Sequence, residues 1–548
     1  MPEMMRRDRI RLDRAAFMTD IGCRTQLYPM GFSVLSWESM DDSVAAVDPS
    51  GLVTATGNGD TRIIAHGESG VRVECIVSVG YPGGNPLLPP TWGLFIADGE
   101  PHAFGDRLYI YGSHDNAFGK NAEEKLEWCS SDYHVIWTED LIHWTDAGVS
   151  ISVEDFPDEL RFERGRIDYL WAPDLFKAPD KNKYYLAFCT GGGLEGCYIA
   201  EGEDPAGPFG NVRKLTYQGE HIKVIDPGVL TDDDGRVYIA LPAPFRLGEL
   251  DPETNYSSII DGSVISLNEL VADSPDGHYG FEGPSLRKFG GRYYYIYIAS
   301  QKDNRLPVRM NYLISENIRE GWRFGGTIID TREYLTAINV HGSVEFFKGK
   351  YLLSYHRPVP GVSLETAPGE HFDLTREMCI EKIEMRPDGT FVQSQTTSSG
   401  VSGSFGRGRR IQAGSAAAFS GGRGDERFVI RGNESSPGSN RWSFTGYAYT
   451  YFSEQGQWNS YRFAELTGCG IVRVSVCSTS GGNVLEFTGV SDESGIARIE
   501  LPDTFGEWVT IEAPLLTVPE EPVEFKVCLK TKPEPGSGPV YLDWIEFV

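Results

Sequence analysis

Residues 105–115, GDRLYIYGSHD, have the pattern of a hairpin arm: a turn pair followed by alternating apolar and polar residues. Similar stretches return four times: KNKYYLAF from Lys181, DGRVYIAL from Asp234, GGRYYYIY from Gly290 and KGKYLLSY from Lys348. Short β runs after Gly or Asn turns are the usual signal of a hairpin. Because the pattern recurs over tens of residues, this part of the chain is expected to be a repeated β unit.

The spacing of the five stretches indicates the size of that unit. The basic residues after the turns are Arg107, Lys183, Arg236, Arg292 and Lys350, which are 76, 53, 56 and 58 residues apart. Four strands with their turns need roughly 40–50 residues, so each repeat is predicted to be one blade of a five-bladed β-propeller. The longer first interval contains two candidate insertions, residues 113–129 and 153–168.

The segments on either side of the repeats also read as β structure. Residues 1–84 alternate between apolar and polar positions, which predicts a small β-sandwich, and the Pro- and Gly-rich YPGGNPLLPP from Tyr81 links it to the repeats. The propeller is expected over residues 85–395 and a low-complexity linker over 396–410. Residues 411–548 contain further strand-like segments and predict a second β-sandwich, a jelly roll. The whole chain is therefore predicted to be all-β.

Composition narrows the class of ligand. The chain has 548 residues and a net charge of −28, which argues against nucleic acid or an anionic membrane as the partner and fits a neutral ligand such as a sugar. No apolar run approaches the ~20 residues of a membrane span. The nine cysteines are scattered without a CxxC or CxxH pair, so no zinc site is expected. The N-terminus lacks the apolar core of a signal peptide, which predicts either a cytoplasmic protein or a secreted one whose leader has been removed.

One ionisable residue precedes each of the five turns at nearly the same distance. Asp98, Asp174 and His341 lie nine residues before the basic residue of their repeat, and Asp226 and Glu282 lie ten before theirs. Taken singly, each would be explained as a turn or strand-end residue, as Asp232 to Asp234 are. In a propeller, however, equivalent positions on the inner strands converge at one end of the axis. Paired carboxylates, one protonated and one ionised, are what glycosidic cleavage requires.

The repeat region resembles glycoside hydrolase family 43, the five-bladed propeller glycosidases. The resemblance rests on IADGEPHAFGDRLYIYGSHD, VIDPGVLTDDDGRVYIA, FEGPSLRK and the outer-strand element EDLIHWTDAG. It implies that Asp98 is the general base, that Glu282 is the general acid, and that Asp226 orients the acid and tunes its pKa. Many members have Asp-Pro at the base position, whereas Asp98 is followed by Gly99, so Glu100 is a nearby rival. We favour Asp98 because it keeps the phase of the repeats.

Two further motifs carry the resemblance. LWAPDLF matches the family's Trp-Ala-Pro-Asp element and implies that Trp171 and Asp174 line the wall of the substrate site. NVHGSVEFFKGKYLLSYHR matches the His motif of the last blade, which implies that His341 faces the axis, contacts the substrate region and supports a calcium ion largely through water. No cofactor is expected for the chemistry itself.

Both flanking segments resemble known modules. SWESMDDSVAAVDPSGLVTATGNG is similar to group 2 bacterial Ig-like domains, which implies a spacer or adhesion module. WNSYRFAEL, GGNVLEFTG, LPDTFGEWVTIEAP and VYLDWIEFV are similar to carbohydrate-binding module family 6. Candidate sugar-stacking residues there are Trp458, Tyr461 and Trp508, although any one of them is more often sandwich core, as we expect for Trp544.

The resemblance implies an inverting, exo-acting hydrolase that removes terminal α-L-arabinofuranose or β-D-xylose from plant cell-wall polysaccharides. The sequence leaves three alternatives open: a galactofuranosidase, an exo-galactanase, or a propeller that binds carbohydrate without hydrolysis. Phosphate chemistry at Gly191-Gly192-Gly193 is disfavoured because no Gly-Lys-Ser/Thr follows.

Overall fold

The computed structural model describes residues 10–548 except 82, 116–130, 162–168, 180, 192–195, 273, 302–306, 332–339, 360–362, 368–369, 374–375, 403–407, 421–427, 436–441 and 532–537. Most of the predicted insertion at 113–129, the end of that at 153–168, and Gly192-Gly193 lie outside the described residues. The described part is β throughout except for short 3-10 turns, α1 (Asp158–Arg161) and α2 (Asn268–Ala272). No helix in these ranges is long and apolar enough to cross a bilayer.

The repeats form five antiparallel sheets. The first contains β10 (Phe95–Phe104), β11 (Arg107–Asp115), β12 (Asp132–Thr138) and β13 (Trp144–Ser152). The second contains β14 (Tyr169–Lys177), β15 (Tyr184–Gly191), β16 (Gly196–Gly202) and β17 (Gly210–Lys214). The third contains β20 (Gly228–Thr231), β21 (Val237–Leu241), β22 (Arg246–Glu249) and β24 (Ile265–Ser266). The fourth contains β25 (His278–Phe289), β26 (Arg292–Gln301), β27 (Pro307–Ser315) and β28 (Arg323–Asp330). The fifth contains β29 (Val344–Phe347), β30 (Lys350–Pro358) and β33 (Arg376–Ile383).

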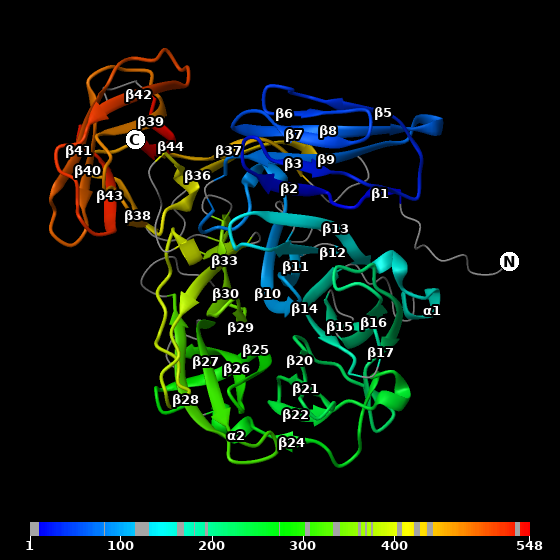
Figure 1. Cartoon of the computed structure of the whole chain (residues 1–548). Helices are drawn as coiled ribbons and strands as arrows, with labels where there is room; N and C mark the ends of the chain where they lie inside the picture. Colours follow the sequence, from blue (N-terminus) through cyan, green and yellow to red (C-terminus); the bar gives the residue numbers. More distant parts are fainter. Residues whose placement is uncertain are drawn as a thin grey trace.

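The predicted repeat phase matches these sheets. In each one, the predicted basic residue begins the second strand or stands immediately before it. The first strands β10, β14, β20, β25 and β29 lie innermost, about a common centre (Figure 1). Each contacts the next one along the chain, and β10 also contacts β29, β30 and β33. An isolated bridge joins Gly99 to Gly342, so the first and last sheets meet at the centre.

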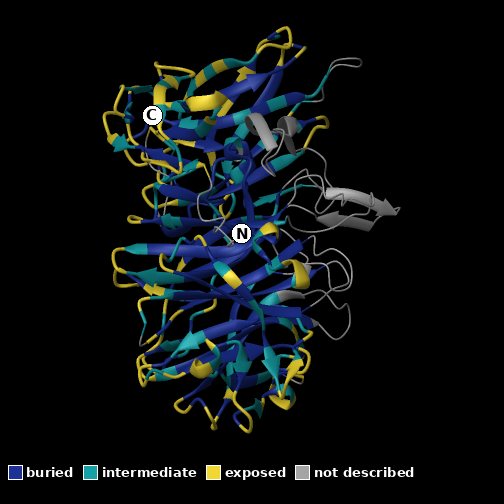
Figure 2. Cartoon of the chain, turned by 90° about the vertical axis from the view of Figure 1, so that its right-hand side faces the viewer, coloured by how far each residue is buried: buried dark blue, intermediate teal, exposed yellow. Residues whose placement is uncertain are grey.

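The small connecting strands lie outside these sheets. They are β18 (Thr216–Tyr217), β19 (Glu220–His221) and β23 (Ser258–Ile259), which form one small sheet, and β31 (Ser363–Ala367) with β32 (Glu370–Asp373), which form another. Buried residues continue through the strands of the main sheets and exposed residues gather at the turns (Figure 2).

The N-terminal segment is joined to the first sheet by strand pairing. Its strands β2 (Ala16–Thr19), β9 (Arg72–Val79), β8 (Gly59–Gly67) and β5 (Val34–Ser39) continue the sheet β10-β11-β12-β13 into one of eight strands. The joining pairs are Phe17 with Thr145 and Ala16 with Asp146. A separate sheet holds β3 (Arg24–Gln26), β7 (Leu52–Ala55) and β6 (Ala45–Val47), and β1 (Arg11–Leu12) pairs with β4 (Pro29–Met30). Strands of the N-terminal segment therefore extend the first sheet.

The C-terminal segment forms two further sheets. One runs β36 (Phe428–Ser435), β37 (Trp442–Phe452), β44 (Val540–Phe547), β39 (Ile471–Cys477), β42 (Val509–Pro514), with β34 (Arg410–Gln412) on β44. The other runs β35 (Ala418–Phe419), β38 (Trp458–Ala464), β43 (Val523–Leu529), β40 (Asn483–Gly489), β41 (Gly495–Leu501). One apolar core lies between them, and it includes Tyr461 with no exposed surface. Tyr461 stacks on Phe525 in that core, so the idea that it stacks on sugar is wrong.

A buried arginine fastens this segment to the fifth sheet. Arg357 of β30 donates to the backbone oxygens of Ala416 (2.8 Å) and Gly414 (2.6 Å) and to the Glu377 carboxylate (2.8 Å). Only 6% of Arg357 is exposed.

Candidate active site

Three of the predicted carboxylates stand where the chain departs from regular geometry. Asp98 lies in a break of register between Ala97 and Glu100 in β10, and its φ is 54°. Asp226 lies two residues before β20 with a φ of 53°. Glu282 lies between two breaks of register in β25. A residue other than Gly or Asn rarely adopts positive φ, so such backbone marks a position that the surrounding structure enforces.

These breaks bring the carboxylates to one buried centre. The backbone N–H of Gly283, next to Glu282, donates to Asp226 Oδ2 at 3.2 Å. A Cβ placed on Gly283 would lie 3.0 Å from His341 Nε2, and His341 Nδ1 lies 3.4 Å from Asp98 Oδ1. Four of the five residues found by phase, all except Asp174, therefore surround the same space.

Asp98 is surrounded by cations and donors. Its Oδ1 accepts from Arg376 Nη1 (2.8 Å), its Oδ2 accepts from the Ser113 hydroxyl (2.6 Å), and its backbone N–H donates to His356 Nδ1 (3.0 Å). Burial alone would raise its pKa, but Arg376, His341 and His356 outweigh burial and hold the pKa of Asp98 well below its usual range. Asp98 is therefore ionised at neutral pH.

Glu282 has the opposite environment. Burial, together with the neighbouring Asp226 charge, raises the pKa of Glu282 to about 8. Burial and the Asp98 charge also raise the pKa of Asp226, to about 6. Glu282 nevertheless keeps some solvent exposure, so a ligand can reach it. Two carboxyl groups with pKa values pushed apart are the pattern of a paired acid and base.

Asp174 lies one layer deeper than predicted. The register breaks between Trp171 and Asp174 in β14, as it does between Ala97 and Glu100 in β10, so Ala172 (φ 35°) takes the place equivalent to Asp98. Asp174 is then equivalent to Glu100, two residues further along the strand. Both carboxylates flank Arg287: Asp174 Oδ2 lies 3.8 Å from Nη1, and Glu100 Oε2 forms an ion pair with Nη2.

Asp174 is 1% exposed, and its oxygens accept from His102 (2.5 Å) and from the backbone N–H groups of Leu175 and Val229 (2.8 and 2.7 Å). Its contacts are thus with protein groups beneath the site. The rival base Glu100 belongs to this same deeper layer, bonded to Arg287 and Ser285.

Trp171 is half-buried, and its ring covers Gly191, where an added Cβ would lie 2.2 Å from a ring atom. Its backbone oxygen accepts from the Tyr133 hydroxyl at 2.9 Å. The thiol of Cys189 bridges the same oxygen (3.3 Å) to the backbone N–H of Asp226 (3.2 Å). The backbone of Trp171 is therefore linked to Asp226 of the carboxylate cluster, and its place in the wall of the substrate site stays a prediction.

His341 does not form a direct metal cage with its neighbours. Burial would lower its pKa, but Asp98 and the other carboxylates raise the pKa of His341 to about 9, and a protonated imidazole is no ligand. Arg376 and Arg287 already occupy oxygens of Asp98 and Glu100. These residues fit a directly coordinated calcium ion poorly, and no step below depends on one.

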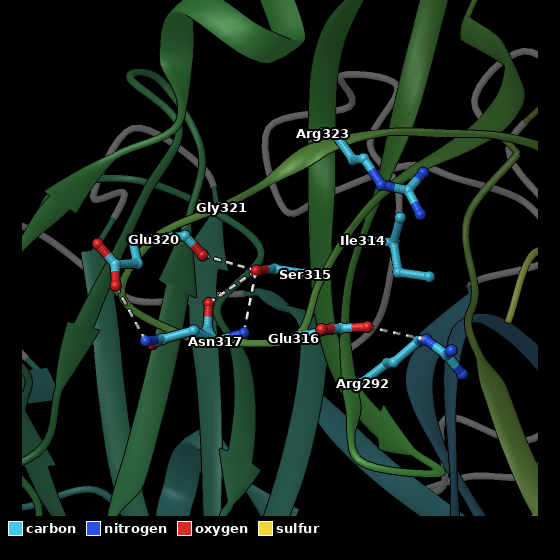
Figure 3. A pocket seen from close by; sticks show the side chains of 8 residues that line it. All are labelled: Arg292, Ile314, Ser315, Glu316, Asn317, Glu320, Gly321 and Arg323. Atoms are coloured by element: carbon cyan, nitrogen blue, oxygen red, sulfur yellow. Dashed lines mark hydrogen bonds and ion pairs between the residues drawn. The ribbon is translucent and has the colours of Figure 1, made fainter. Parts of the chain in front are cut away.

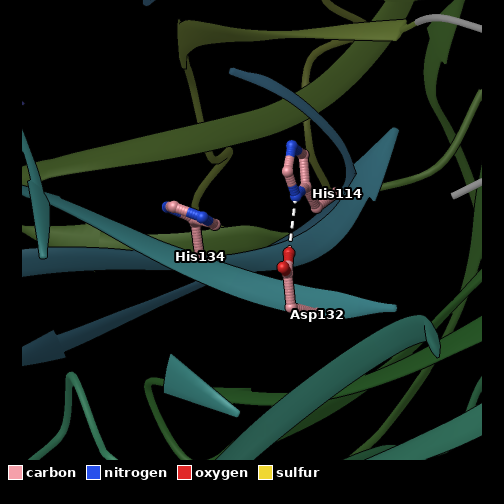
Figure 4. Close-up of side chains that lie close together, drawn as sticks. All are labelled: His114, Asp132 and His134. Carbon is pink, nitrogen blue, oxygen red and sulfur yellow. Dashed lines mark hydrogen bonds and ion pairs between the residues drawn. The ribbon is translucent and has the colours of Figure 1, made fainter. Parts of the chain in front are cut away.

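Among the described residues one set of His, Asp and Glu side chains brings three ligand-type atoms within 4.8 Å of one another: His114, Asp132 and His134 (Figure 4). His114 Nδ1 lies 2.7 Å from Asp132, and His134 Nδ1 lies 3.0 Å from Asp146. Each imidazole therefore already has a carboxylate partner, and we interpret the set as two buried His–Asp pairs.

A cavity of about 490 Å³ lies at the end of the fourth sheet opposite to Glu282 (Figure 3). It is lined by Arg292, Ile314, Ser315, Glu316, Asn317, Glu320, Gly321 and Arg323. Arg292 pairs with Phe289 at one end of the β25–β26 hairpin, whereas Glu282 pairs with Ile298 towards the other. This cavity is therefore remote from the carboxylates.

The sequence did not point to Arg376, His356 or Ser113. Arg376 begins the last strand of the fifth sheet and has no counterpart in the repeat phase. Two of the three lie in stretches quoted above: Ser113 in GSHD at the end of the opening stretch, and His356 in NVHGSVEFFKGKYLLSYHR.

Comparison with known proteins identifies the repeat region. The model of the family "Glycosyl hydrolases family 43" matches residues 90–391, more than half of the chain. A xylosidase/arabinosidase of Thermoclostridium stercorarium is 30% identical over 350 residues, covering 58% of this chain and 67% of that protein. Xylosidase/arabinosidase 43A of Humicola insolens is 27% identical over 361 residues, covering 56% of this chain and 98% of that one. Among solved structures, an arabinoxylan arabinofuranohydrolase from Bacillus subtilis aligns with 85% of this chain and 98% of its own, at 21% identity and a TM-score of 0.46.

Proposed function

Because the chain belongs to family 43 of the glycosyl hydrolases, we propose that it is an exo-acting, inverting glycosidase. Its proposed substrates are xylan- or arabinoxylan-derived oligosaccharides, from which it removes terminal β-D-xylose or α-L-arabinofuranose. The names of the related proteins, xylosidase/arabinosidase in both cases above, support this substrate class. The observation that carries the mechanism is the contrast between Asp98, held ionised, and Glu282, held protonated.

The proposed reaction is a single displacement. Glu282 gives its proton to the glycosidic oxygen as the bond from that oxygen to the anomeric carbon breaks. A water molecule attacks the opposite face of the anomeric carbon, and Asp98 accepts the proton that this water loses. The products are the free sugar, the shortened oligosaccharide, an ionised Glu282 and a protonated Asp98, which exchange protons with solvent before the next turnover. General acid and base assistance of this kind is worth about 10²–10⁴-fold for each group.

The surrounding residues take supporting roles in this proposal. Asp226 holds the backbone beside Glu282 and keeps the acid protonated through its charge. Trp171 forms the wall of the sugar site, and His341 holds Asp98 from the side of the last sheet. For Asp174 we propose a positioning role beneath that wall, since its oxygens are engaged by His102 and by backbone N–H groups.

We further propose the module assignment expected from the sequence. Residues 85–395 are a closed five-bladed propeller, residues 1–84 an Ig-like module, residues 396–410 a linker and residues 411–548 a module like the family 6 carbohydrate-binding modules. The bridge between Gly99 and Gly342 supports closure. Of the aromatic candidates in the last module, Trp508 is half-buried and Trp458 carries Lys526 over its ring. Any calcium ion near His341 would be held mainly through water.

A panel of aryl glycosides tests the proposed function. Release of aryl alcohol from β-D-xylopyranosides or α-L-arabinofuranosides, lost in Glu282→Gln, is the expected result. Turnover restricted to a galactofuranoside would replace the proposed sugar. Sugar binding without turnover of any member of the panel would assign the chain to the non-catalytic class.

A further inference from the structure

The end of the opening stretch, Asp115, makes contacts that the proposed mechanism has not used. Asp115 is the last residue of β11 and is 1% exposed. Its Oδ2 accepts from the backbone N–H (2.9 Å) and from Nε (2.8 Å) of Arg376, and its Oδ1 accepts from Arg376 Nη2 (2.9 Å). The buried Asp115 carboxylate thus binds both the backbone N–H and the guanidinium of Arg376. The two guanidinium bonds form a bidentate pair, which is a strong geometry for arginine and a carboxylate.

The remaining nitrogen of the same guanidinium reaches the proposed base. Arg376 Nη1 donates to Asp98 Oδ1 at 2.8 Å. Arginine has a long side chain with many rotamers, and its position at Asp98 depends on what fixes the rest of the head. Asp115 supplies three of the four hydrogen bonds named here, while Arg376 comes from the fifth sheet and both aspartates come from the first.

We infer that Asp115 is a positioning residue for the reaction: it fixes the Arg376 guanidinium so that Nη1 holds the Asp98 carboxylate in the orientation needed to receive the proton of the attacking water. This inference rests on the proposed function, because it assigns Asp115 to the base named there. Asp115 does not touch the substrate in this scheme and acts only through Arg376.

If Asp115 had only a structural role, it would hold the first and fifth sheets together through Arg376 without affecting the base Asp98. The pH dependence of activity distinguishes this role from the positioning role. The groups that face Asp98 are Arg376 from β33, His356 from β30, His341, and the Asp226 and Glu282 carboxylates. The charge of Arg376 is one of the main causes that lower the pKa of Asp98, beside His341 and His356. A released guanidinium would raise the pKa of Asp98, and since the base must be ionised, the acid limb of kcat/KM would move to higher pH.

The test is Asp115→Asn in the full chain, with Asp115→Glu as the charge-conserving variant. Asp146→Asn is the matched control, because Asp146 is a fully buried aspartate of the same first sheet that pairs with His134 and lies outside the contacts of Asp98. We expect Asp115→Asn to lower kcat at least tenfold and to shift the acid limb upwards, Asp115→Glu to restore the limb in part, and Asp146→Asn to leave it in place. An unmoved limb in Asp115→Asn, or an equal shift in Asp146→Asn, would overturn the inference.

A crystal structure of Asp115→Asn gives a readout that does not require turnover. Arg376 Nη1 should lie beyond hydrogen-bonding distance of Asp98 in that variant, and a guanidinium still bonded to Asp98 would refute the inference whatever the activity. If Asp115→Asn does not fold, the same two measurements are made on Asp115→Glu, where the longer side chain should shift the guanidinium part of the way from Asp98, with a smaller rise of the acid limb than expected for Asp115→Asn. A guanidinium and an acid limb that both stay in place would overturn the inference. Failure of the wild-type chain to hydrolyse any aryl glycoside would count against the proposed function and leave this structural comparison to decide the role of Asp115.

Discussion

Replacing Glu282 with glutamine removes the proposed acid while keeping the size and polarity of the side chain. With a pKa of about 8, Glu282 is roughly nine-tenths protonated at pH 7, whereas at its ordinary value of 4.5 it would be protonated in about 0.3% of molecules. The environment therefore raises the working form of the acid about 300-fold. Losing proton transfer altogether should reduce kcat by about 10²–10⁴-fold when the leaving group is a sugar hydroxyl.

The assay compares two leaving groups on the same terminal sugar. Release of xylose or arabinose from an arabinoxylo-oligosaccharide needs the proton, because a sugar alkoxide is a poor leaving group. Release of dinitrophenolate needs little assistance, so Glu282→Gln should retain most of its rate on the dinitrophenyl glycoside. For the wild type, activity on the oligosaccharide should fall as pH rises through about 8, since the acid then loses its proton. Equal losses on both substrates, or an alkaline limb that persists in Glu282→Gln, would refute the assignment of Glu282.

Three further outcomes are expected. Asp226→Asn removes a negative charge that raises the pKa of Glu282, so the alkaline limb of kcat/KM should move to lower pH, and an unmoved limb would show that burial alone sets that pKa. Proton NMR at the start of hydrolysis should show the inverted anomer first, because a base acting through water leaves no covalent intermediate, and a first product with retained configuration would contradict Asp98 as base. Arg357→Leu leaves the partly buried Glu377 carboxylate without its partner and should cost up to about 3–5 kcal/mol of stability. Calorimetry should show a lower transition temperature, and Arg357→Leu/Glu377→Leu should recover part of the loss.

The repeat phase predicted the sheets well because the hairpin turns recur in the sequence itself. Turn pairs and Tyr-rich runs are local signals, and each correctly gave the start of the second strand of a sheet. The pairing of β2 with β13 had no such signal, since two edge strands that join at Phe17 and Thr145 need no special residues. The sequence therefore gives no sign that strands of the N-terminal segment continue the first sheet, and the Ig-like module assignment stays a prediction.

The same phase brought Asp98, Asp226, Glu282 and His341 to one centre but misplaced Asp174. Counting back from the turn assumes hairpins of equal length, but Glu100 pairs with Tyr111, eleven residues on, whereas its equivalent Asp174 pairs with Ala187, thirteen residues on. Ala172 takes the place at the centre, and Asp174, two residues further on, lies in the deeper layer that also contains Glu100. Two extra residues in the β14–β15 hairpin shift the count by two, so the residue nine positions before Lys183 lies one layer away from the place that Asp98 takes.

The partners of Asp98 show why its chemistry could not be predicted from neighbouring sequence. Its backbone N–H binds His356, 258 positions away, and its carboxylate binds Arg376, 278 positions away. Both partners belong to the fifth sheet, whose strands β29, β30 and β33 contact β10 of the first sheet. Until these sheets meet, Asp98 has neither the guanidinium nor the imidazole that lowers its pKa. An ionised base at the centre is therefore a property of the assembled sheets, and changes at the contact between the first and last sheets should alter the acid limb of activity even where they leave every proposed catalytic residue in place.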